Sequence, residues 1–221
     1  MVVWVARRVS ELGLADRVVV ATDAPEIQVA IARAGFEGVL TSSAHETGTE
    51  RVAEVIANKE FKSFDLILNV QGDEPLVAAA AVRGAVDRVR GGDPIGTSAG
   101  ALDAALATDP SRVKVVVDAA GRARYFSRAP IPFDRDGGGT VRYHQHVGVY
   151  AYTRDALERW VRLPPVNEER WERLEQLRPL LHGIPIGVTL FAEAPAPGVD
   201  TPADVAIVER MLTQTLKAVT R

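Results

Sequence analysis

The sequence predicts an α/β fold with a mainly parallel sheet, helices on both of its faces, and an antiparallel hairpin added to it. Short apolar runs typical of buried strands alternate with amphipathic segments of helical spacing through the first half of the chain. Strands separated by helices usually lie parallel between two layers of helices. From Val113 the alternation gives way to two extended runs joined by a turn that contains Gly121, which predicts the hairpin.

Apolar spacing, prolines and glycines predict the elements of the first half in order. The segment from Val2 to Leu12 has its apolar residues at helical spacing, and the run RVVVA is typical of a buried strand. A helix then starts on Pro25 and stops at Gly35. The expected elements are helices over 2–12, 25–34, 48–58 and 78–90, with strands over 17–21 and 65–70.

The second half begins with the hairpin and returns to helices. Two extended runs, VKVVVD and RARYFSR, flank the turn, and the proline- and glycine-rich segment 131–140 predicts an exposed loop. Pro164 and Pro165 separate two expected helices, and the last helix starts after Thr201 and Pro202. The expected elements are strands over 143–152 and 186–192, with helices over 154–162, 168–181 and from 202 onward.

The composition excludes several classes of function. The 26 basic and 29 acidic residues leave no basic excess for binding DNA or RNA. The absence of cysteine excludes disulfides, thiolate metal sites and a cysteine nucleophile, so any metal would have oxygen or imidazole ligands. Because no signal-peptide pattern is visible and no stretch approaches the roughly 20 apolar residues that span a bilayer, we expect a cytoplasmic enzyme with no membrane partner.

Polar residues that directly follow apolar strands are the first candidates for a site, since ligands of open α/β sheets collect at the carboxyl ends of the strands. The segment NVQGDEP contains Gln71, a hydrogen-bonding amide, and Asp73, a hard oxygen donor suited to Mg2+. Asp200 follows the last expected strand and precedes the final helix. Asp73 also suits an ordinary turn and Asp200 a helix N-cap, and whether the two converge stays open at this point.

A second candidate is the helix start TGTER, residues 47–51, where free backbone N–H groups suit a base, a ribose or a phosphate. The alternative is a capping box with no ligand. None of the four histidines has the i, i+4 spacing of a helical zinc site; His144 and His146 share a strand face, where each suits either a structural role or an anion. The sequence patterns of hydrolase elbows, P-loops and dinucleotide-binding loops are absent.

Seven motifs occur in one order along the chain: VATD, ETGTERVAEV, ILNVQGDEP, VKVVVDAAGRARYFSRAPIPFDR, QHVGVYAY, RLEQLR and GVDTPADV. Each is weak alone, but the ordered set resembles the 3-deoxy-manno-octulosonate cytidylyltransferase (CMP-Kdo synthetase) family over essentially the whole chain. The intermediate motifs differ in relatives that activate sialic acid. The resemblance implies a Rossmann-like fold of the nucleotide-diphospho-sugar transferase type in a single domain over 1–221, and a homodimer formed through the elaboration over 113–152.

The reaction that the resemblance implies joins CMP from CTP to Kdo and releases pyrophosphate, before Kdo enters lipopolysaccharide. By the same resemblance, Asp73 and Asp200 would be the catalytic ligands of Mg2+. The residues that would border the nucleotide are Thr47, Gly48, Thr49 and Arg51. The residues that would line the Kdo site are Gln71, Arg128, His146, Tyr150, Glu175 and Gln176. Without the family, the motif LEQLR would read as a plain solvated helix face.

Members of the resembled family normally open with a strand and an A-R-x-x-S-x-R-L-P-G-K-P loop whose Arg and Lys hold the triphosphate. The segment from Ala6 to Ser10 shares letters with that loop but lies in the helix expected over 2–12. We expect the complete protein to carry the loop before Met1 and its activity to depend on it. Two alternatives stay open: an inactive or binding-only truncated homologue, and a cytidylyltransferase for another acidic sugar.

Overall fold

The computed structural model describes residues 1–199 and 201–219, which form two compact units. Unit 1 consists of residues 1–43 and 70–78 with the described part of 196–221, and unit 2 of residues 44–69 and 79–195. The expectation of a single domain over 1–221, with 113–152 as its elaboration, stays a prediction.

Unit 1 contains a two-stranded parallel pair with helices packed on it. Strands β1 and β2 pair in parallel, with Val19 opposite Glu37, and helix α2 connects them. Pro25 begins α2, and Gly35, at φ +81°, supplies the left-handed residue that lets the chain turn after its end. The elements are α1 (Val2–Glu11), β1 (Val19–Thr22), α2 (Pro25–Arg33), β2 (Glu37–Leu40) and α8 (Pro202–Val219).

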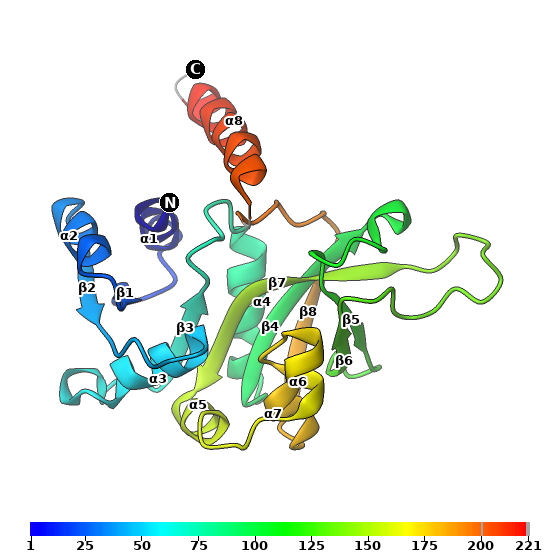
Figure 1. The fold of residues 1–221 in the computed structure, drawn as a ribbon, viewed down its shortest axis with the longest axis horizontal. Coiled ribbons are helices and arrows are strands. Elements are labelled where there is room, and N and C mark those ends of the chain that lie inside the picture. Colours follow the sequence, from blue (N-terminus) through cyan, green and yellow to red (C-terminus); the bar gives the residue numbers. More distant parts are fainter. Residues whose placement is uncertain (200, 220–221) are drawn as a thin grey trace. The chain divides into compact units, whose positions relative to one another are not determined.

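Unit 2 is built on a six-stranded sheet in which the long strand β7 is central (Figure 1). The sheet order is β6-β5-β7-β4-β8, and β3 also pairs with β7. Strands β4 and β8 are parallel, whereas β7 runs antiparallel to both β4 and β5. The strands are β3 (Leu66–Val70), β4 (Ile95–Leu102), β5 (Lys114–Val117), β6 (Ala123–Ser127), β7 (Tyr143–Thr153) and β8 (Ile186–Phe191).

Helices cover both faces of this sheet, which confirms the predicted fold class. On one face α4 approaches so closely that a Cβ on Gly96 would lie 2.0 Å from the Ala85 carbonyl oxygen. The residues of β4 that alternate with Gly96, such as Ile95 and Ala99, point to the opposite face and join the main core with α5 and α7. The helices are α3 (Gly48–Ala57), α4 (Ala79–Arg90), α5 (Arg154–Trp160), α6 (Asn167–Glu172) and α7 (Leu177–Leu181), with short 3-10 helices at Lys59–Phe61 and Ala104–Leu106.

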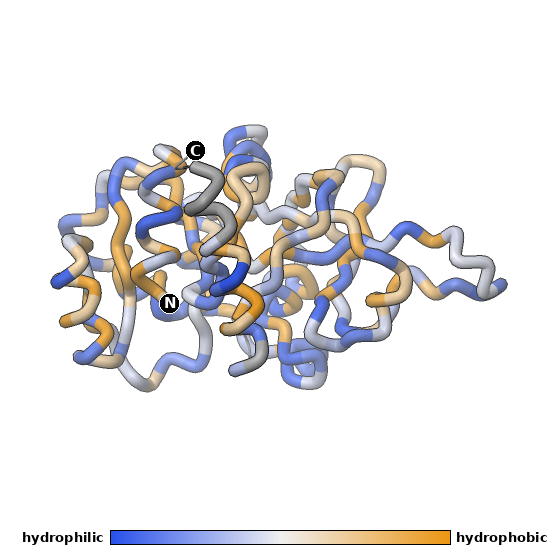
Figure 2. The backbone as a smooth tube through the Cα atoms, turned by 90° about the horizontal axis from the view of Figure 1, so that it is seen from above, coloured by the Kyte–Doolittle hydropathy of each residue, from blue (hydrophilic) through white to orange (hydrophobic). Residues whose placement is uncertain are grey.

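The hairpin predicted after Val113 is confirmed. Strands β5 and β6 pair antiparallel, with Lys114 opposite Ser127, and Gly121 takes φ +72° in the turn between them. The exposed loop expected over 131–140 is also present. It extends away from the sheet of unit 2 and is largely hydrophilic (Figures 1 and 2).

Two expectations about the elements differ from the structure. The single helix expected over 168–181 is wrong: it is split into α6 and α7, because Arg173 adopts the left-handed conformation at φ 52° and ends α6. Strands β2 and β4 were not expected from the sequence. The run IGTSAGAL of β4 is rich in small residues of low strand propensity. The close approach of α4 requires Gly96, and that of residues 191–195 requires Gly100. No helix in the described part of the chain is both long and apolar enough to cross a membrane.

Candidate active site

The start of α3 is held by a capping box of its own residues. The Glu50 N–H donates to the Thr47 hydroxyl oxygen at 3.2 Å, and the Glu46 N–H donates to a Glu50 carboxylate oxygen at 3.0 Å. The cap expected for TGTER is therefore present, in a form in which the Glu50 carboxylate accepts from the Glu46 N–H rather than from the Thr47 N–H. Gly48 and Arg51 lie in the first turn of the same helix, and the nucleotide-binding role expected for these residues stays a prediction.

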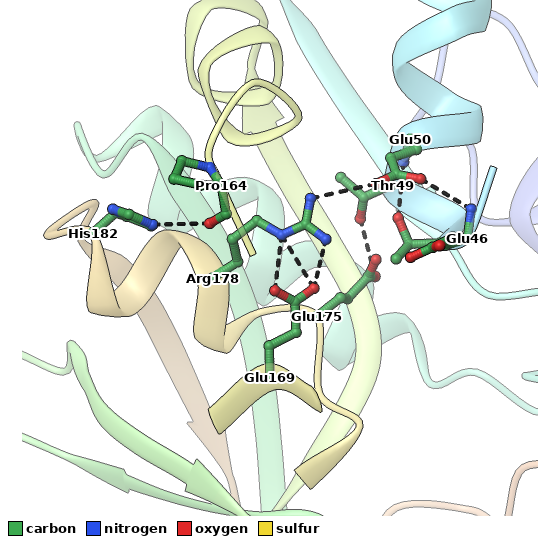
Figure 3. Close-up of polar contacts among 9 residues, drawn as sticks. Glu46, Thr49, Glu50, Pro164, Glu169, Glu175, Arg178 and His182 are labelled. Carbon is green, nitrogen blue, oxygen red and sulfur yellow. Dashed lines mark hydrogen bonds and ion pairs between the residues drawn. The ribbon is translucent and has the colours of Figure 1, made fainter. Parts of the chain in front are cut away.

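Thr49, in the first turn of α3, belongs to a buried polar cluster that includes Glu175. Thr49 is 1% exposed, and its hydroxyl donates to Glu175 Oε1 at 3.0 Å (Figure 3). Its oxygen also lies 3.4 Å from the Tyr152 hydroxyl, which accepts from the Asn69 amide at 3.4 Å. The structure thus brings together Thr49, expected beside the nucleotide, and Glu175, expected beside the sugar.

Glu175 combines a satisfied oxygen with an unsatisfied one. Burial raises the pKa of its carboxyl group, although hydrogen bonds from Thr49 and Thr47 and the charge of Arg178 act in the opposite direction. Its Oε2 atom is buried and has no hydrogen-bond partner among residues 1–199 and 201–219. A buried carboxylate oxygen without a donor is costly, and a ligand hydroxyl would satisfy it.

An aromatic group of β7 and α5 packs beside this carboxylate. The rings of Tyr150 and Tyr152 stack at 5.9 Å, and Trp160 meets both of them edge-on. Burial raises the pKa of both tyrosines, and the nearby Glu175 carboxylate adds to the effect. Both hydroxyls therefore stay protonated. The Tyr150 hydroxyl can donate to a ligand, whereas the Tyr152 hydroxyl donates to the Thr49 oxygen, whose own hydrogen goes to Glu175. Sequence reasoning missed Asn69, Tyr152 and Trp160; the only signals were the polar residue within an apolar strand and the alternating aromatics of YAY.

His146 is neutral in this environment. Part of the residue remains accessible, but its ring packs against Phe126 and Tyr150, and burial lowers its pKa to about 3. The Thr97 hydroxyl donates to the Val149 carbonyl at 2.7 Å and lies 3.0 Å from His146 Nε2. Since that hydroxyl has one hydrogen, His146 Nε2 is the donor to it, and Nδ1 is left as an acceptor. This arrangement suits a sugar hydroxyl better than a sugar carboxylate.

We predict that the His146 ring keeps a constant NMR chemical shift between pH 5 and 8. A histidine with a folded pKa of about 3 and an ordinary unfolded pKa binds its proton only on unfolding, so stability is lost as pH falls below about 6.5. At pH 5.5 the loss from this residue is about 1.4 kcal/mol relative to neutral pH. A His146→Gln variant should show a shallower pH dependence of unfolding. A ring that titrates near pH 6.5 in the folded protein would contradict the assignment.

Arg128 is engaged with backbone carbonyls. Its guanidinium donates to Pro110 and Glu172 at 2.7 Å each and to Arg173 at 3.4 Å, and its backbone N–H donates to the Glu172 carboxylate at 2.9 Å. These bonds tie the end of β6 to the end of α6. Lys114, fully buried beside it, donates to the Arg128 carbonyl, and burial lowers its pKa. Sequence reasoning missed this lysine, and the role of Arg128 at a sugar carboxylate stays a prediction.

The remaining expected sugar ligands lie in different surroundings. Gln176 is buried at the start of α7, next to Glu175, and Tyr150 is buried in the aromatic group. Gln71 belongs to unit 1, where its carbonyl accepts from the Glu74 N–H at 3.2 Å in the turn after β3.

Asp73 lies in that turn, and the segment before Asp200 lies against it. The Val199 N–H donates to the Asp73 carbonyl at 2.9 Å, and a Cβ on Gly198 would lie 3.4 Å from the same oxygen. Asp200 itself lies outside the described residues. The described residues contain no group of three or more metal-binding side chains. Mg2+ commonly takes one or two carboxylates with substrate phosphates, so Asp73 and Asp200 fit it in type and number.

These features describe an α/β protein with polar residues gathered at strand ends and at one helix start, as in enzymes that act on nucleotides. A sequence model of the cytidylyltransferase family matches residues 1–186. The protein is therefore of the cytidylyltransferase class. The chain is 53% identical to a 3-deoxy-manno-octulosonate cytidylyltransferase of Gemmatimonas aurantiaca, over 92% of this chain and 81% of that protein. The chain belongs to the 3-deoxy-manno-octulosonate cytidylyltransferase family.

Further relatives agree with this assignment. A protein of the same name from Polynucleobacter necessarius is 43% identical over 96% of this chain and 85% of its own length. A solved structure of CMP:2-keto-3-deoxy-manno-octonic acid synthetase complexed with CTP superposes with a TM-score of 0.87 at 39% identity, covering 96% of this chain and 87% of that one. A 4-diphosphocytidyl-2C-methyl-D-erythritol synthase from Anaerococcus prevotii has a TM-score of 0.56 at 12% identity, which shows the fold alone.

Proposed function

We propose that this protein transfers CMP from CTP to 3-deoxy-D-manno-octulosonate (Kdo), releasing pyrophosphate, and so activates Kdo for lipopolysaccharide synthesis. The observation that carries the proposal is the match, at a TM-score of 0.87 and 39% identity, to a synthetase of this sugar solved with CTP. The buried, unpaired Oε2 of Glu175 is consistent with a polyhydroxylated ligand, because a sugar hydroxyl would supply the missing donor.

In the proposed reaction the anomeric hydroxyl oxygen of the sugar attacks the α-phosphorus of CTP. A phosphorus–oxygen bond to the sugar forms, the bond to pyrophosphate breaks, and the hydroxyl proton is released to water. Asp73 and Asp200 would hold Mg2+, which when bound favours the alkoxide and screens the charge of the triphosphate. In this proposal Thr47, Gly48, Thr49 and Arg51 border the nucleotide.

The residues of unit 2 orient the sugar in this proposal. Glu175 Oε2 and His146 Nδ1 accept from sugar hydroxyls, and the protonated hydroxyl of Tyr150 donates to sugar oxygens. Arg128 and Gln176 complete the proposed sugar site of unit 2. Gln71, of unit 1, is the further residue that the proposal assigns to the sugar. Orientation of this kind accelerates a bimolecular reaction by removing the entropy cost of bringing the reactants together.

The assembly and location belong to the same proposal. We expect a homodimer that uses the segment 113–152, whose loop carries Phe133 with 82% of its surface exposed. We expect the enzyme in the cytoplasm.

We predict that pyrophosphate release from CTP requires both Kdo and Mg2+. The measurement is a coupled pyrophosphate assay with each component omitted in turn, combined with the mass of the sugar product. Sialic acid and an eight-carbon amino sugar serve as competing acceptors, so a product from either of them at the higher kcat/KM would replace Kdo in the proposal. Calorimetric binding of CTP or Kdo, with no turnover even by the full-length native protein, would favour the binding-only alternative.

A further inference from the structure

A buried cation, Arg178, connects three helices next to the proposed sugar site. Its side chain is 7% exposed and lies between two carboxylates (Figure 3). Nε and Nη2 donate to the Glu169 carboxylate of α6, at 2.9 and 2.7 Å in the shorter contacts, and Nη1 donates to Glu50 of α3 at 3.3 Å. A guanidinium can hold two carboxylates at once in fixed directions, whereas an ammonium cannot reproduce the fork.

Glu50 links Arg178 to the start of α3. It is the carboxylate of the capping box, because it accepts from the Glu46 N–H while its own N–H donates to Thr47. Arg178 therefore binds the residue that organises the first turn of α3, the same turn from which Thr49 donates to Glu175.

Glu175 is also attached directly to the turn that carries Arg178. The Arg178 N–H donates to the Glu175 carbonyl at 3.1 Å, so the two residues share one turn of backbone. Residue 178 thus contacts both sides of the Thr49–Glu175 contact: its backbone N–H holds the turn that carries Glu175, and its guanidinium holds the helix start that carries Thr49. Its charge also lowers the pKa of Glu175 against the effect of burial.

We propose that Arg178 is a positioning residue for the acidic sugar: by joining α7 to α6 and to the start of α3, it holds Glu175 with Oε2 available to a sugar hydroxyl. This inference rests on the proposed function, in which Glu175 binds the sugar. Arg178 itself bonds Glu169 and Glu50 and acts on the sugar only through Glu175.

The charged and titratable groups that face Glu175 set its pKa, so the inference can be tested through the pH dependence of activity. Arg178 faces it from α7, while Tyr150 and Tyr152 face it from β7 and stay protonated. Removal of the Arg178 charge raises the pKa of Glu175 further, so the carboxylate is lost at a higher pH. The acid limb of the kcat/KM profile for the sugar is then expected to move to higher pH.

The test compares Arg178→Met, Arg178→Lys and the double variant Glu169→Gln/Arg178→Met with the unaltered protein. The double variant is included because Arg178→Met alone leaves Glu169 as an unpaired buried charge, which endangers folding. Arg162→Met is the matched control, since that arginine is 78% exposed and pairs with Glu158 on the surface. The measurements are KM for Kdo and for CTP, kcat across pH 5 to 9, and calorimetric binding of Kdo.

We expect the double variant to raise KM and the dissociation constant for Kdo at least about tenfold, with kcat reduced less. Arg178→Lys should restore the acid limb but not the full affinity, because it returns the charge without the fork. A merely structural role would reduce the amount of active enzyme and leave KM and the acid limb unchanged, and that result overturns the inference. If the unaltered protein binds no Kdo, the proposed function fails with it; if it binds and turns over Kdo while the double variant matches it, only the inference fails.

Discussion

Replacement of Asp73 by asparagine is expected to lower kcat/KM for CMP transfer roughly 1000-fold, the loss of several kcal/mol of metal-borne charge stabilisation. Asparagine has nearly the same shape as aspartate but lacks the charge that binds Mg2+. The backbone carbonyl of Asp73, and not its side chain, accepts from the Val199 N–H, so the variant keeps that contact. Pyrophosphate release measured against Mg2+ concentration should show a weaker apparent metal affinity.

Asp16→Asn is the control for this variant, because Asp16 is an exposed aspartate of the same unit. The proposed metal pair also predicts non-additivity. If Asp73 and Asp200 hold one ion, the double Asp73→Asn/Asp200→Asn variant should be little worse than either single variant, since residues that act as a unit do not add. Losses that multiply, or an Asp73→Asn variant within threefold of the unaltered protein, would argue against a shared metal.

Replacement of Trp160 by alanine is expected to destabilise the protein by about 4 kcal/mol, in the range for removal of a large buried aromatic side chain. Trp160 is 1% exposed and meets the rings of Tyr150 and Tyr152 edge-on at 6.0 and 5.6 Å. Its loss opens a cavity in the main core of unit 2 and removes the support of the two tyrosines. Thermal unfolding should shift down by roughly 10 °C, and KM for Kdo should rise as the tyrosines lose their fixed positions.

Trp171→Ala provides the matched comparison, because Trp171 is 75% exposed on α6. That variant should change stability by less than about 0.5 kcal/mol. Equal shifts in the two tryptophan variants would mean that the aromatic group does not carry the stability assigned to it. A Trp160→Ala variant with the stability loss but an unchanged KM would separate packing from sugar binding.

Much of the fold was predictable because its signals are local. The helix that starts on Pro25 and stops at Gly35, and the hairpin turned at Gly121, follow from the conformations that these residues favour. Strand β4 was not predictable in this way. Gly96 is required by the approach of α4, and Gly100 by the approach of residues 191–195. These are contacts between segments that the sequence does not mark as neighbours.

The site divides in the same way. Thr49 and Glu175 could be named in advance through the resemblance of the motifs TGTER and LEQLR, in their order along the chain, to the family. Their direct hydrogen bond could not, because the two residues are 126 positions apart in the sequence. The same is true of Arg178, which reads in the sequence as an ordinary helix residue.

The sequence by itself determined the α/β class, the order of most elements, the family and the residue types available for binding. Only the tertiary structure decided which of those residues meet. It also decided which ring nitrogen of His146 carries the proton and which oxygen of Glu175 has no hydrogen-bond donor. The physical reason is that secondary structure depends on neighbours along the chain, whereas burial, pKa and hydrogen-bond satisfaction depend on neighbours in space.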